Sequence, residues 1–442
     1  MPNIVVVGGG LAGSEASWQL AKRGFSVDLY EMRPFVESAA HSTAQLAEVV
    51  CSNSFGGESE ESAAGILKAE LALGGSLILD CAHISRVPAG GALAVDRDKF
   101  AELVSAHIES NPNIRVIRTE VMDIPSAPCV IATGPLSSTA MTKALRARVG
   151  DYLSFFDAVA PIVTRESINM EKAYIAGRYG RGNDYINCPM NKEEYLAFYE
   201  CLAGAERVVP HSFERGMRFS EDSYFEGCMP IEEMASRGLD TLRFGPMKPV
   251  GLPDPRTGRE PYAAAQLRAD NREGTLFNLV GFQTGLKWGA QERLLKTIPA
   301  LENADIARFG VMHRNIYVNA PEALDEHLRL KKLLSESGES VFLAGQITGV
   351  EGYMESTAMG LVAGLNAACL LSGAPLPVWP PESAIGSLLR YLNDNTAKSF
   401  QPMNTNLGIF PPLGQKVKNK KLKAKMFYDR SLSASKAFWE SM

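Results

Sequence analysis

Residues 3–33 read NIVVVGGGLAGSEASWQLAKRGFSVDLYEMR, and this stretch decides the fold. An apolar, β-branched run at 4–7 predicts a strand, and the glycines after it predict a tight turn. The turn opens a predicted helix, and a second apolar run at 27–30 predicts another strand. This order of strand, turn, helix and strand is the start of a Rossmann unit, which belongs to the α/β class of folds.

The glycines of the turn fit the pattern G-x-G-x-x-G at Gly8, Gly10 and Gly13. In that pattern they serve a tight turn, a close approach of the backbone to a pyrophosphate, and close packing of helix on strand. The N-terminus of the helix then faces the anionic pyrophosphate. Glu31 follows about 20 residues later, where an acid accepts hydrogen bonds from the ribose of adenosine. The stretch predicts a dinucleotide site, and the alternative is a glycine-rich turn in an empty Rossmann unit.

The composition is that of a globular enzyme with two or three lobes. The chain has 442 residues, too many for a single core, and its hydrophobic and charged contents of 45% and 21% are ordinary. The net charge of −5 creates no global basic field, so nucleic-acid binding would need a local patch. The seven cysteines include no C-x-x-C pair, which argues against a disulfide framework or a zinc knuckle.

The N-terminal sequence enters a strand almost at once and shows no basic n-region or cleavage site, so it predicts no signal peptide. We find no stretch that is long and apolar enough to cross a bilayer. Scattered single cysteines suit a reducing cytoplasm. The expectation is a cytoplasmic protein that binds neither a membrane nor a metal ion.

A Rossmann-like segment returns near residue 340, where VFLAGQITGVEGYMESTAMG reads as a strand, a glycine-rich loop and a helix. Before it, short strand-like pieces and helices mix with many Gly and Pro turns, which is typical of an inserted α+β lobe. We therefore predict three parts: a split Rossmann-type domain at 1–150 and 306–375, an inserted α+β substrate domain at 151–305, and a C-terminal helical, basic segment at 376–442.

Two features favour FAD over NAD as the dinucleotide. The first two strands must join strands at 129–133 and 341–344 across a large insertion, as in flavoproteins with a divided Rossmann unit. VIATGP at 130–135 resembles the ATG strand end of many FAD enzymes, and 342–352 resembles their second FAD loop, which would stabilise negative charge on the reduced ring. The predicted FAD contacts are Gly8, Gly9, Gly10, Leu11, Ala12, Gly13, Glu31, Arg33, Thr133, Gly134, Gly345, Gly352 and Tyr353.

Small residues recur at helical spacing after that loop, at Ala358, Gly360, Ala363, Gly364 and Ala367. They would let the helix lie close to a sheet or to a cofactor. Plain packing of one helix on another is the alternative.

Two cysteines stand in loops rather than in apolar runs. Cys51 lies in CSNSFGG, and Cys228 lies just before a predicted helix start at Pro230. A thiol near a helix N-terminus has a lowered pKa and more thiolate, so both are candidates for a reactive role. For the other five we expect inert, mostly buried thiols: Cys81, Cys129, Cys188, Cys201 and Cys369.

Four runs in or next to the predicted inserted domain interleave cations and amides with aromatic residues among tight turns: 177–182, 244–252, 281–289 and 312–321. Such runs can bind a planar anionic ligand or a splayed base, and a solvated surface is the alternative. The densest cluster is His313, Arg314 and Asn315.

Taken together, these strings resemble the family of flavin- and folate-dependent tRNA uracil-5-methyltransferases. The likeness runs through GGGLAGSEA, YEMRP, VCSNSFGGE, RVPAGGALAVDR, FEGCMP, GPMKPVGL, GFQTGLKW, GVMHRN and GVEGYMES, and it covers nearly the whole chain. The match is weakest in the C-terminal tail and at 330–340. A longer flavoprotein that helps to build carboxymethylaminomethyl groups on wobble uridines is similar at a distance.

The resemblance implies a reductive methylation. Methylenetetrahydrofolate supplies a one-carbon unit, NAD(P)H reduces FAD, and the flavin supplies the electrons that make this unit a methyl group. The product is 5-methyluridine in the T-loop of tRNA. NAD(P)H would visit the flavin transiently, because the sequence holds no second Rossmann unit for nicotinamide.

The resemblance also implies roles for single residues. Cys228 matches the nucleophile that adds to C6 of uracil, and Cys51 matches the second functional cysteine, a base for the C5 proton or a protector of the flavin adduct. Tyr353 would stack on the isoalloxazine or folate ring. His313 and Arg314 would bind folate.

The RNA contacts are less defined by sequence. Arg178, Arg181 and the lysines within 416–425 are candidates for contacts with phosphates. The same chemistry on ribosomal RNA fits these motifs equally well. Two further alternatives are an FAD oxidoreductase acting on a small molecule and a non-catalytic, flavin-stabilised RNA-binding protein.

Overall fold

The structure is a computed structural model, and it describes residues 3–38, 40–150, 153–208, 229–394, 396 and 400–442. Cys228, the predicted nucleophile, lies outside the described residues. The strand that carries His313 and Arg314 is described, but their side chains are not. These three predictions are therefore carried forward as predictions.

A parallel sheet forms the centre of the first lobe. Within the described residues its five strands run in the order β16-β7-β1-β2-β6. Their bounds are β1 (Asn3–Val7), β2 (Ser26–Glu31), β6 (Ile114–Arg118), β7 (Cys129–Ile131) and β16 (Val341–Leu343). The strands are short and rich in Val and Ile because helices cover both faces of a parallel sheet. The predicted Rossmann-type α/β fold is confirmed, including the union of distant strands across an insertion.

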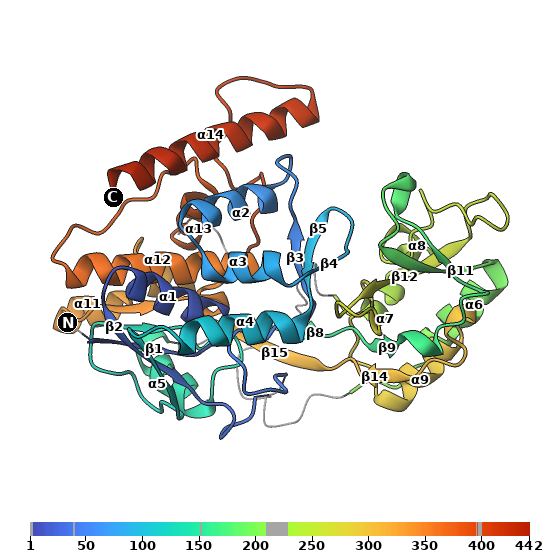
Figure 1. The fold of residues 1–442 in the computed structure, drawn as a ribbon, viewed down its shortest axis with the longest axis horizontal. Helices are drawn as coiled ribbons and strands as arrows, with labels where there is room; N and C mark the ends of the chain where they lie inside the picture. The colour runs from blue at the N-terminus through green and yellow to red at the C-terminus, as the bar shows by residue number, and fades with distance from the viewer. Residues whose placement is uncertain (1–2, 39, 151–152, 209–228, 395, 397–399) are drawn as a thin grey trace.

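Two helices from opposite ends of the chain pack together over this sheet. They are α1 (Leu11–Lys22) and α12 (Tyr353–Leu371), which lie side by side in Figure 1. A Cβ atom at Gly360 would lie 2.3 Å from the carbonyl oxygen of Ala12, and one at Gly364 would lie 2.8 Å from that of Ala16. At Gly360 and Gly364 the small residues of α12 therefore allow close contact with another helix, rather than with the sheet or a cofactor.

Helix α12 also corrects a prediction from the sequence. By length and composition it is able to cross a membrane, with a mean hydropathy of 1.3, so the expectation that no such stretch exists was wrong. However, 89% of this apolar window is buried inside the protein. A core helix that contacts protein on most sides is apolar all round for the same reason as a membrane helix.

The second lobe, at the right of Figure 1, is built on an antiparallel sheet. In the described part of the chain its six strands run in the order β10-β11-β12-β13-β9-β14. They are β9 (Ile162–Thr164), β10 (Tyr174–Ile175), β11 (Tyr185–Met190), β12 (Ala263–Ala269), β13 (Leu276–Leu279) and β14 (Ile306–Arg308). Its helices are α6 (Lys192–Ala203), α7 (Ile231–Ser236), α8 (Thr241–Phe244) and α9 (Trp288–Lys296). Strand β14 of this sheet starts just after residue 305, the predicted end of the inserted domain. The predicted domain limits stay a prediction.

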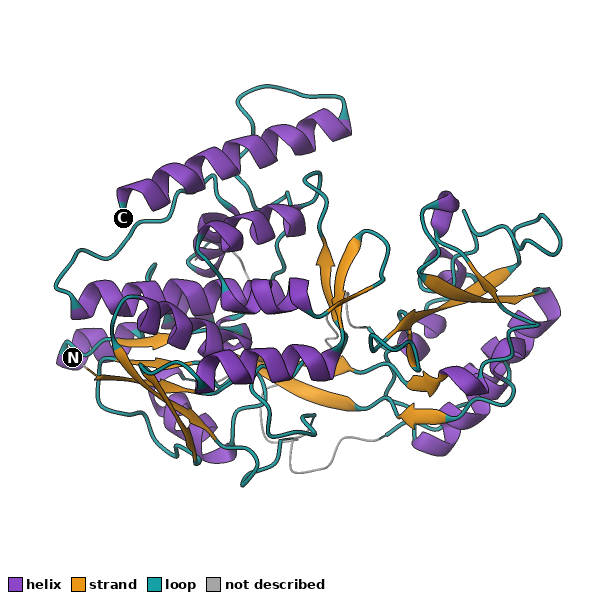
Figure 2. Ribbon diagram, in the orientation of Figure 1, coloured by secondary structure: helices purple, strands orange, loops and turns teal. Residues whose placement is uncertain are grey.

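A two-stranded ribbon runs between the lobes (Figure 2). It pairs β8 (Leu153–Ala158) with β15 (Met312–Tyr317), so the chain enters and leaves the second lobe side by side. A small sheet, β3-β5-β4, lies beside the first lobe and carries the loop of Cys51 at its edge. Its strands are β3 (Ser54–Gly57), β4 (Arg86–Val87) and β5 (Ala92–Val95).

The remaining helices complete the first lobe and its covering layer. They are α2 (Ala63–Leu73), α3 (Leu77–Ile84), α4 (Arg97–Glu109), α5 (Thr139–Val149), α10 (Ala320–Ala323), α11 (Lys331–Ser337), α13 (Ala384–Leu392) and α14 (Lys420–Ser441), with 3₁₀ turns η1 (Arg165–Ser167), η2 (Arg178–Gly180), η5 (Pro299–Leu301) and η6 (Gln346–Thr348). Asp96 caps the N-terminus of α4, since its carboxylate accepts a hydrogen bond from the N–H of Lys99 at 3.0 Å.

A buried carboxylate ties the C-terminal segment to the first lobe. Glu70 of α2 accepts hydrogen bonds from the N–H groups of Ala384 and Ile385, at 2.7 and 3.0 Å, and from the hydroxyl of Ser431. Burial raises the pKa of Glu70 to about 7, although these donors pull it down. The predicted basic segment is therefore a docked pair of helices, in which Lys425 forms surface ion pairs with Glu60 and Asp429.

Candidate functional site

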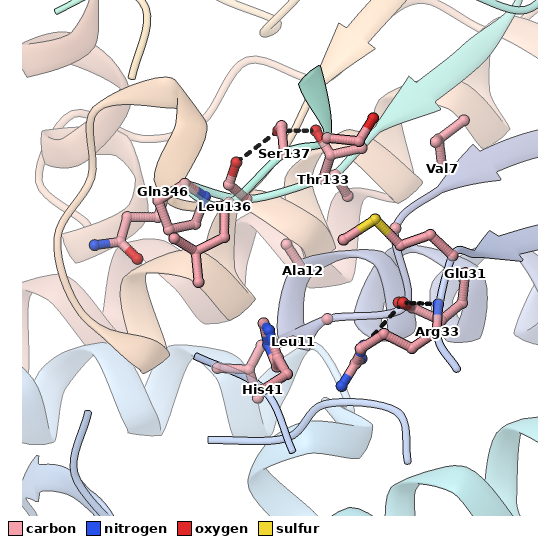
Figure 3. A pocket seen from close by; sticks show the side chains of 18 of the residues that line it. Val7, Leu11, Ala12, Glu31, Arg33, His41, Thr133, Leu136, Ser137 and Gln346 are labelled. Atoms are coloured by element: carbon pink, nitrogen blue, oxygen red, sulfur yellow. Dashed lines mark hydrogen bonds and ion pairs between the residues drawn. The ribbon is translucent and has the colours of Figure 1, made fainter. Parts of the chain in front are cut away.

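A pocket opens at the carboxyl ends of β1, β2 and β7, the place where open α/β sheets bind their ligands. The space between its walls is about 1100 Å³, its open mouth included. Figure 3 shows Glu31 and Arg33 on one side of the pocket, Leu136 and Gln346 on the other, and Ala12 of α1 between them.

Most of the predicted cofactor residues meet in this one pocket. Those that line it are Gly8, Gly10, Leu11, Ala12, Glu31, Arg33, Thr133, Gly134, Gly345 and Tyr353, together with Cys51. Gly9 and Gly13 lie behind the lining, and Gly352 directly precedes Tyr353. The structure thus brings together residues from four separate stretches of sequence.

The three motif glycines have three different geometries. Gly8 has φ of +103°, and a Cβ there would lie 2.5 Å from the carbonyl oxygen of Ala132. A Cβ at Gly13 would lie only 1.8 Å from the carbonyl oxygen of Gly8, so helix and strand pack closely at this point. A Cβ at Gly10 would meet open space in the pocket. This pattern matches the turn, packing and ligand-approach roles expected of a dinucleotide fingerprint.

Glu31 is buried at the end of β2 and faces the glycine turn. Its carboxylate accepts hydrogen bonds from the N–H of Gly9 at 2.9 Å and from the Arg33 side chain at 2.9 Å. Burial alone would raise the pKa of Glu31, but the Arg33 guanidinium and the N–H donors outweigh it and hold the pKa below its usual range. Glu31 therefore stays ionised and keeps acceptor capacity toward the pocket.

Arg33 is itself fixed by a second carboxylate. Its Nη1 lies 3.1 Å from Glu48, whose carboxylate also accepts hydrogen bonds from the N–H groups of Ser42 and Thr43. Burial would raise the pKa of Glu48, but these hydrogen bonds lower it below its usual range. The loop after β2 is thus folded over the edge of the pocket, where His41 also lines the wall.

Cys51 and Tyr353 meet at the same wall. The hydroxyl of Tyr353 accepts hydrogen bonds from the N–H groups of Cys51 at 3.0 Å and Ser52 at 3.2 Å, and it donates to the carbonyl of Ser52 at 3.0 Å. The Tyr353 ring also packs on Phe55, with 5.2 Å between the ring centroids. The first turn of α12 therefore holds the cysteine loop against the pocket.

The comparisons with known proteins agree with this architecture. A family model described as glucose inhibited division protein A matches residues 3–375. A protein of Moorella thermoacetica is 55% identical over 432 residues, 97% of this chain and 96% of the relative. One of Anoxybacillus flavithermus is 52% identical over 441 residues, 99% of this chain and 100% of the relative. Both are named methylenetetrahydrofolate–tRNA-(uracil-5-)-methyltransferase TrmFO. The chain belongs to the TrmFO family.

Among solved structures, GidA of Aquifex aeolicus in its form II crystal superposes with a TM-score of 0.69 at 16% identity, covering 99% of this chain and 73% of that one. At this identity the likeness shows the fold alone. It confirms the Rossmann-type architecture with its large insertion, here in a shorter TrmFO chain.

In this TrmFO-family chain a buried polar network lies directly behind the Cys51 loop. The amide of Asn53 accepts hydrogen bonds from Arg268 and Asn278, both at 3.0 Å, and it donates to the carbonyl of Ala269. Arg268 also donates to the hydroxyl of Ser52 at 3.1 Å. The second lobe therefore holds the backbone next to Cys51 through buried hydrogen bonds, which are costly to leave unmade.

The network extends to a buried ion pair between the lobes. Arg97 donates to Asp270 at 3.0 Å and to the carbonyl groups of Val49 and Val50 at 2.7 and 3.1 Å. Asp270 in turn accepts a hydrogen bond from Asn278. Both ends of the Cys51 loop are thus fixed by side chains that belong to, or pair with, the second lobe.

The surroundings of Cys228 in the TrmFO chain are described from Met229 onward. Helix α7 is tied to the loop of the GFQTGLKW string by Glu232, whose carboxylate accepts hydrogen bonds from the Thr284 hydroxyl at 2.9 Å and the Gly285 N–H at 2.6 Å. A Cβ at Gly285 would lie 3.1 Å from the sulfur of Met312, next to His313 in the chain. The segments around two predicted site residues therefore converge.

Several pocket residues were not among the predicted contacts. They are Tyr30, Met32, His41, Glu48, Thr119, Glu120, Val121, Leu136, Ser137, Asn315 and Gln346. Some of them stand in or next to strings that the sequence singled out: Tyr30 and Met32 in YEMRP, Leu136 and Ser137 after 130–135, Asn315 in the cluster with His313, and Gln346 within 342–352. The others, His41, Glu48 and residues 119–121, had no signal in the sequence. Ser137 and Thr133 hydrogen-bond through their hydroxyls at 2.6 Å, which closes the turn after β7 (Figure 3).

Other predicted residues lie elsewhere. Arg178 is half-buried and donates to the carbonyl of Val250, and Arg181 is exposed in the same loop of the second lobe. Burial raises the pKa of the thiols of Cys81, Cys129 and Cys188 to about 12, so they are inert as expected. Cys369 is also buried, whereas Cys201 is half-buried. Over the described ranges, no cluster of His, Cys, Asp and Glu could hold a metal ion.

Proposed function

We propose that this protein is a folate-dependent tRNA (uracil-5-)-methyltransferase. It transfers a one-carbon unit from methylenetetrahydrofolate to C5 of a uridine in the T-loop of tRNA, with NAD(P)H as the source of electrons and FAD as the bound cofactor. The observation that carries the proposal is that Cys51 lines the same pocket as Gly10 and Tyr353. The names of the close relatives point to the same reaction.

The residues present fit FAD. The open space at Gly10 and the N-terminus of α1 suit the pyrophosphate, and ionised Glu31 suits the ribose of adenosine. Thr133, Gly134 and Gly345 would line the path toward the flavin. Tyr353 would face the ring system beside Cys51. When bound, FAD supplies the two electrons, taken from NAD(P)H, that reduce the transferred carbon from the formaldehyde level to a methyl group.

The chain's own part in the chemistry is nucleophilic and acid–base. The thiolate of Cys228 adds to C6 of uracil, and the electron pair of the C5–C6 double bond moves into an enolate. C5 then forms a bond to the methylene carbon of the donor, and the carbon–nitrogen bond that this carbon gives up breaks with its electron pair left on nitrogen. Cys51 takes the proton from C5, the C6–S bond breaks, and the thiolate of Cys228 leaves with its electron pair. The place of Cys51 at the pocket wall and the likeness of the FEGCMP string around Cys228 to the family support this pair.

The remaining contacts follow from charge and position. His313 and Arg314 would bind folate, on a strand whose neighbouring Asn315 lines the pocket. Arg178, Arg181 and the lysines of the C-terminal segment would contact RNA phosphates. We propose a cytoplasmic location, where single thiols persist; the six described cysteines are all free.

The test is mass spectrometry of nucleosides. The purified protein, yellow with FAD, is incubated with unmodified tRNA transcript, NADPH and methylenetetrahydrofolate labelled at its methylene carbon. Labelled 5-methyluridine in the tRNA is the expected result. Label in ribosomal RNA but not in tRNA would change the substrate, and no label in either RNA, with a flavin that NADPH still reduces, would overturn the proposal in favour of a small-molecule oxidoreductase.

A further inference from the structure

The second lobe carries an exposed pair of aromatic rings. Trp288, the first residue of α9, exposes 61% of its surface, and its ring is stacked on that of Phe309 with 5.1 Å between the centroids and 14° between the planes. A tryptophan so exposed gains little from burial in this structure. Phe309 covers one face of the ring, and more than half of the residue's surface remains exposed to solvent.

A buried amide fixes the two rings relative to each other. Gln291 is almost fully buried and donates to the carbonyl groups of Leu286 at 2.7 Å and Gly310 at 2.8 Å, while its oxygen accepts from the N–H of Gly310 at 2.8 Å. One side chain thus clamps the loop before Trp288 to the loop after Phe309. The pair is pre-organised, because a ligand that stacks on it need not order these loops first.

The pair stands beside the candidate site. Arg308, next to Phe309, donates to the carbonyl of Ala40 at 3.4 Å, one residue from His41 of the pocket wall. The loop before Trp288 includes Gly285, which Glu232 ties to the helix that follows Cys228. One of the two stretches that carry the rings therefore reaches the pocket wall, and the other is tied to the helix that follows Cys228.

The surroundings suit a phosphate chain. Lys287 precedes Trp288 and forms an ion pair with Glu206 at 2.9 Å, in which both side chains are more than half exposed. Such exposed pairs are weak, so this lysine can turn to another anion. The guanidinium of Arg293 lies 3.6 Å from the place where a Cβ of Gly289 would stand. Exposed aromatic faces flanked by cations are how proteins bind unpaired bases.

We propose that Trp288 and Phe309 form a stacking platform for an unpaired base of the RNA substrate at the edge of the catalytic pocket. The inference rests on the proposed function and deepens it, since it assigns part of the RNA-docking surface. It places the contact on the second lobe, while the basic C-terminal helix lies against the first.

The test compares Trp288→Ala with Ile175→Ala in the FAD-loaded protein. Ile175 is 51% exposed on β10 of the same lobe, lies outside the four candidate binding runs and serves as the control. Affinity for unmodified tRNA transcript is measured by fluorescence anisotropy. We expect Trp288→Ala to weaken binding roughly 5- to 150-fold, the usual effect of removing one base–aromatic stack. Ile175→Ala should bind as the wild type does, and flavin content and flavin reduction by NADPH should be unchanged in both.

A second measurement does not depend on the alanine variant folding. Trp288→Phe keeps a ring, so it should bind tRNA within a few-fold of wild type but lose the tRNA-induced quenching of tryptophan emission that Trp288 provides. Equal quenching in wild type and Trp288→Phe would overturn the platform. Unchanged tRNA affinity in Trp288→Ala would also overturn the platform. If that variant keeps its tRNA affinity but changes its sedimenting mass, the rings form a contact between copies of the chain instead. Binding is measured here without turnover. If the wild-type protein methylates no tRNA but still binds it through Trp288, the proposed reaction is refuted and this inference stands.

Discussion

The hydroxyl of Tyr353 accepts a hydrogen bond from the backbone N–H of Cys51, with 3.0 Å between the two atoms. The residues are 302 positions apart in the chain. The same hydroxyl also binds both backbone polar groups of Ser52. The phenol that is predicted to stack on a ring ligand therefore also holds the backbone of a predicted catalytic cysteine.

Tyr353→Phe separates these two roles. The phenyl ring still lines the pocket, but the N–H groups of Cys51 and Ser52 lose their acceptor, and such loss in a partly buried site costs about 1–3 kcal/mol. We expect methyl transfer in single-turnover assays to fall roughly tenfold at unchanged flavin content. Tyr174→Phe, which removes a buried hydroxyl bonded to a carbonyl in the second lobe, is the control and should leave the rate unchanged. Equal rates in Tyr353→Phe and wild type would show that the hydroxyl does not position Cys51.

Substitutions at two glycines of one motif should have different effects, one on cofactor binding and the other on stability. A valine at Gly10 meets open space in the protein, and the φ of −73° at that position suits any residue, so Gly10→Val should fold but come off the column colourless. Gly13→Ala places a Cβ 1.8 Å from the carbonyl oxygen of Gly8 and should lower the melting temperature and the soluble yield. Flavin absorbance and thermal unfolding measure both effects. A yellow Gly10→Val protein would contradict the assignment of the pyrophosphate site to this turn.

The sequence predicted what depends on local pattern. Strands β1 and β2 and the glycine turn follow from the pattern of apolar residues and from backbone conformation within a few residues. It also placed the far strand β16, because that segment repeats the pattern of a Rossmann strand.

The sequence could not predict contacts that exist only after the lobes pack. Asn53 and Arg268 are 215 positions apart and neither belongs to a motif that names the other. The small residues of α12 allowed contact with a sheet, a cofactor or another helix, and the sequence could not choose because close packing depends on the partner. In the structure Gly360 and Gly364 contact α1. His41 and Glu48 stand in a loop whose course depends on Arg33.

The ion pair between the lobes should contribute more to the free energy of unfolding than a surface pair of the same type. Asp270→Asn removes the charge partner of buried Arg97, and breaking a buried pair costs about 3–5 kcal/mol. We expect a clear loss of melting temperature and faster alkylation of Cys51, because Arg97 also holds Val49 and Val50. Asp240→Asn breaks an exposed pair with Arg243 and should change the melting temperature little. Similar small losses in both variants would mean that the lobes do not depend on this pair.

Alanine variants of the two cysteines should differ in whether they form a covalent RNA–protein adduct. Cys228→Ala should form no covalent RNA–protein adduct and no 5-methyluridine, because the bond to C6 is never made. Cys51→Ala should form the adduct but release product slowly, because the C5 proton has lost its base. Denaturing gels of the flavin-loaded variants with labelled tRNA measure the adduct. An adduct in Cys228→Ala that is absent in Cys51→Ala would exchange the two assignments.

The docking of the C-terminal helices should weaken as pH rises. Burial raises the pKa of Glu70 to about 7 from a usual value of 4.5, so the folded protein holds a proton that the unfolded chain has lost. Stability from this group is therefore full below about pH 4.5 and is lost as pH rises through about 7. Glu70→Gln should have a lower melting temperature at every pH, since an amide cannot accept from both Ala384 and Ile385 as the carboxylate does. The melting temperature of Glu70→Gln should, however, decline less between pH 5 and 8 than that of wild type.

The control is Glu60→Gln, which removes the exposed ion-pair partner of Lys425 on α14. Its melting temperature should follow the wild-type slope with pH. Parallel slopes in Glu70→Gln and wild type would show that Glu70 does not set this pH dependence.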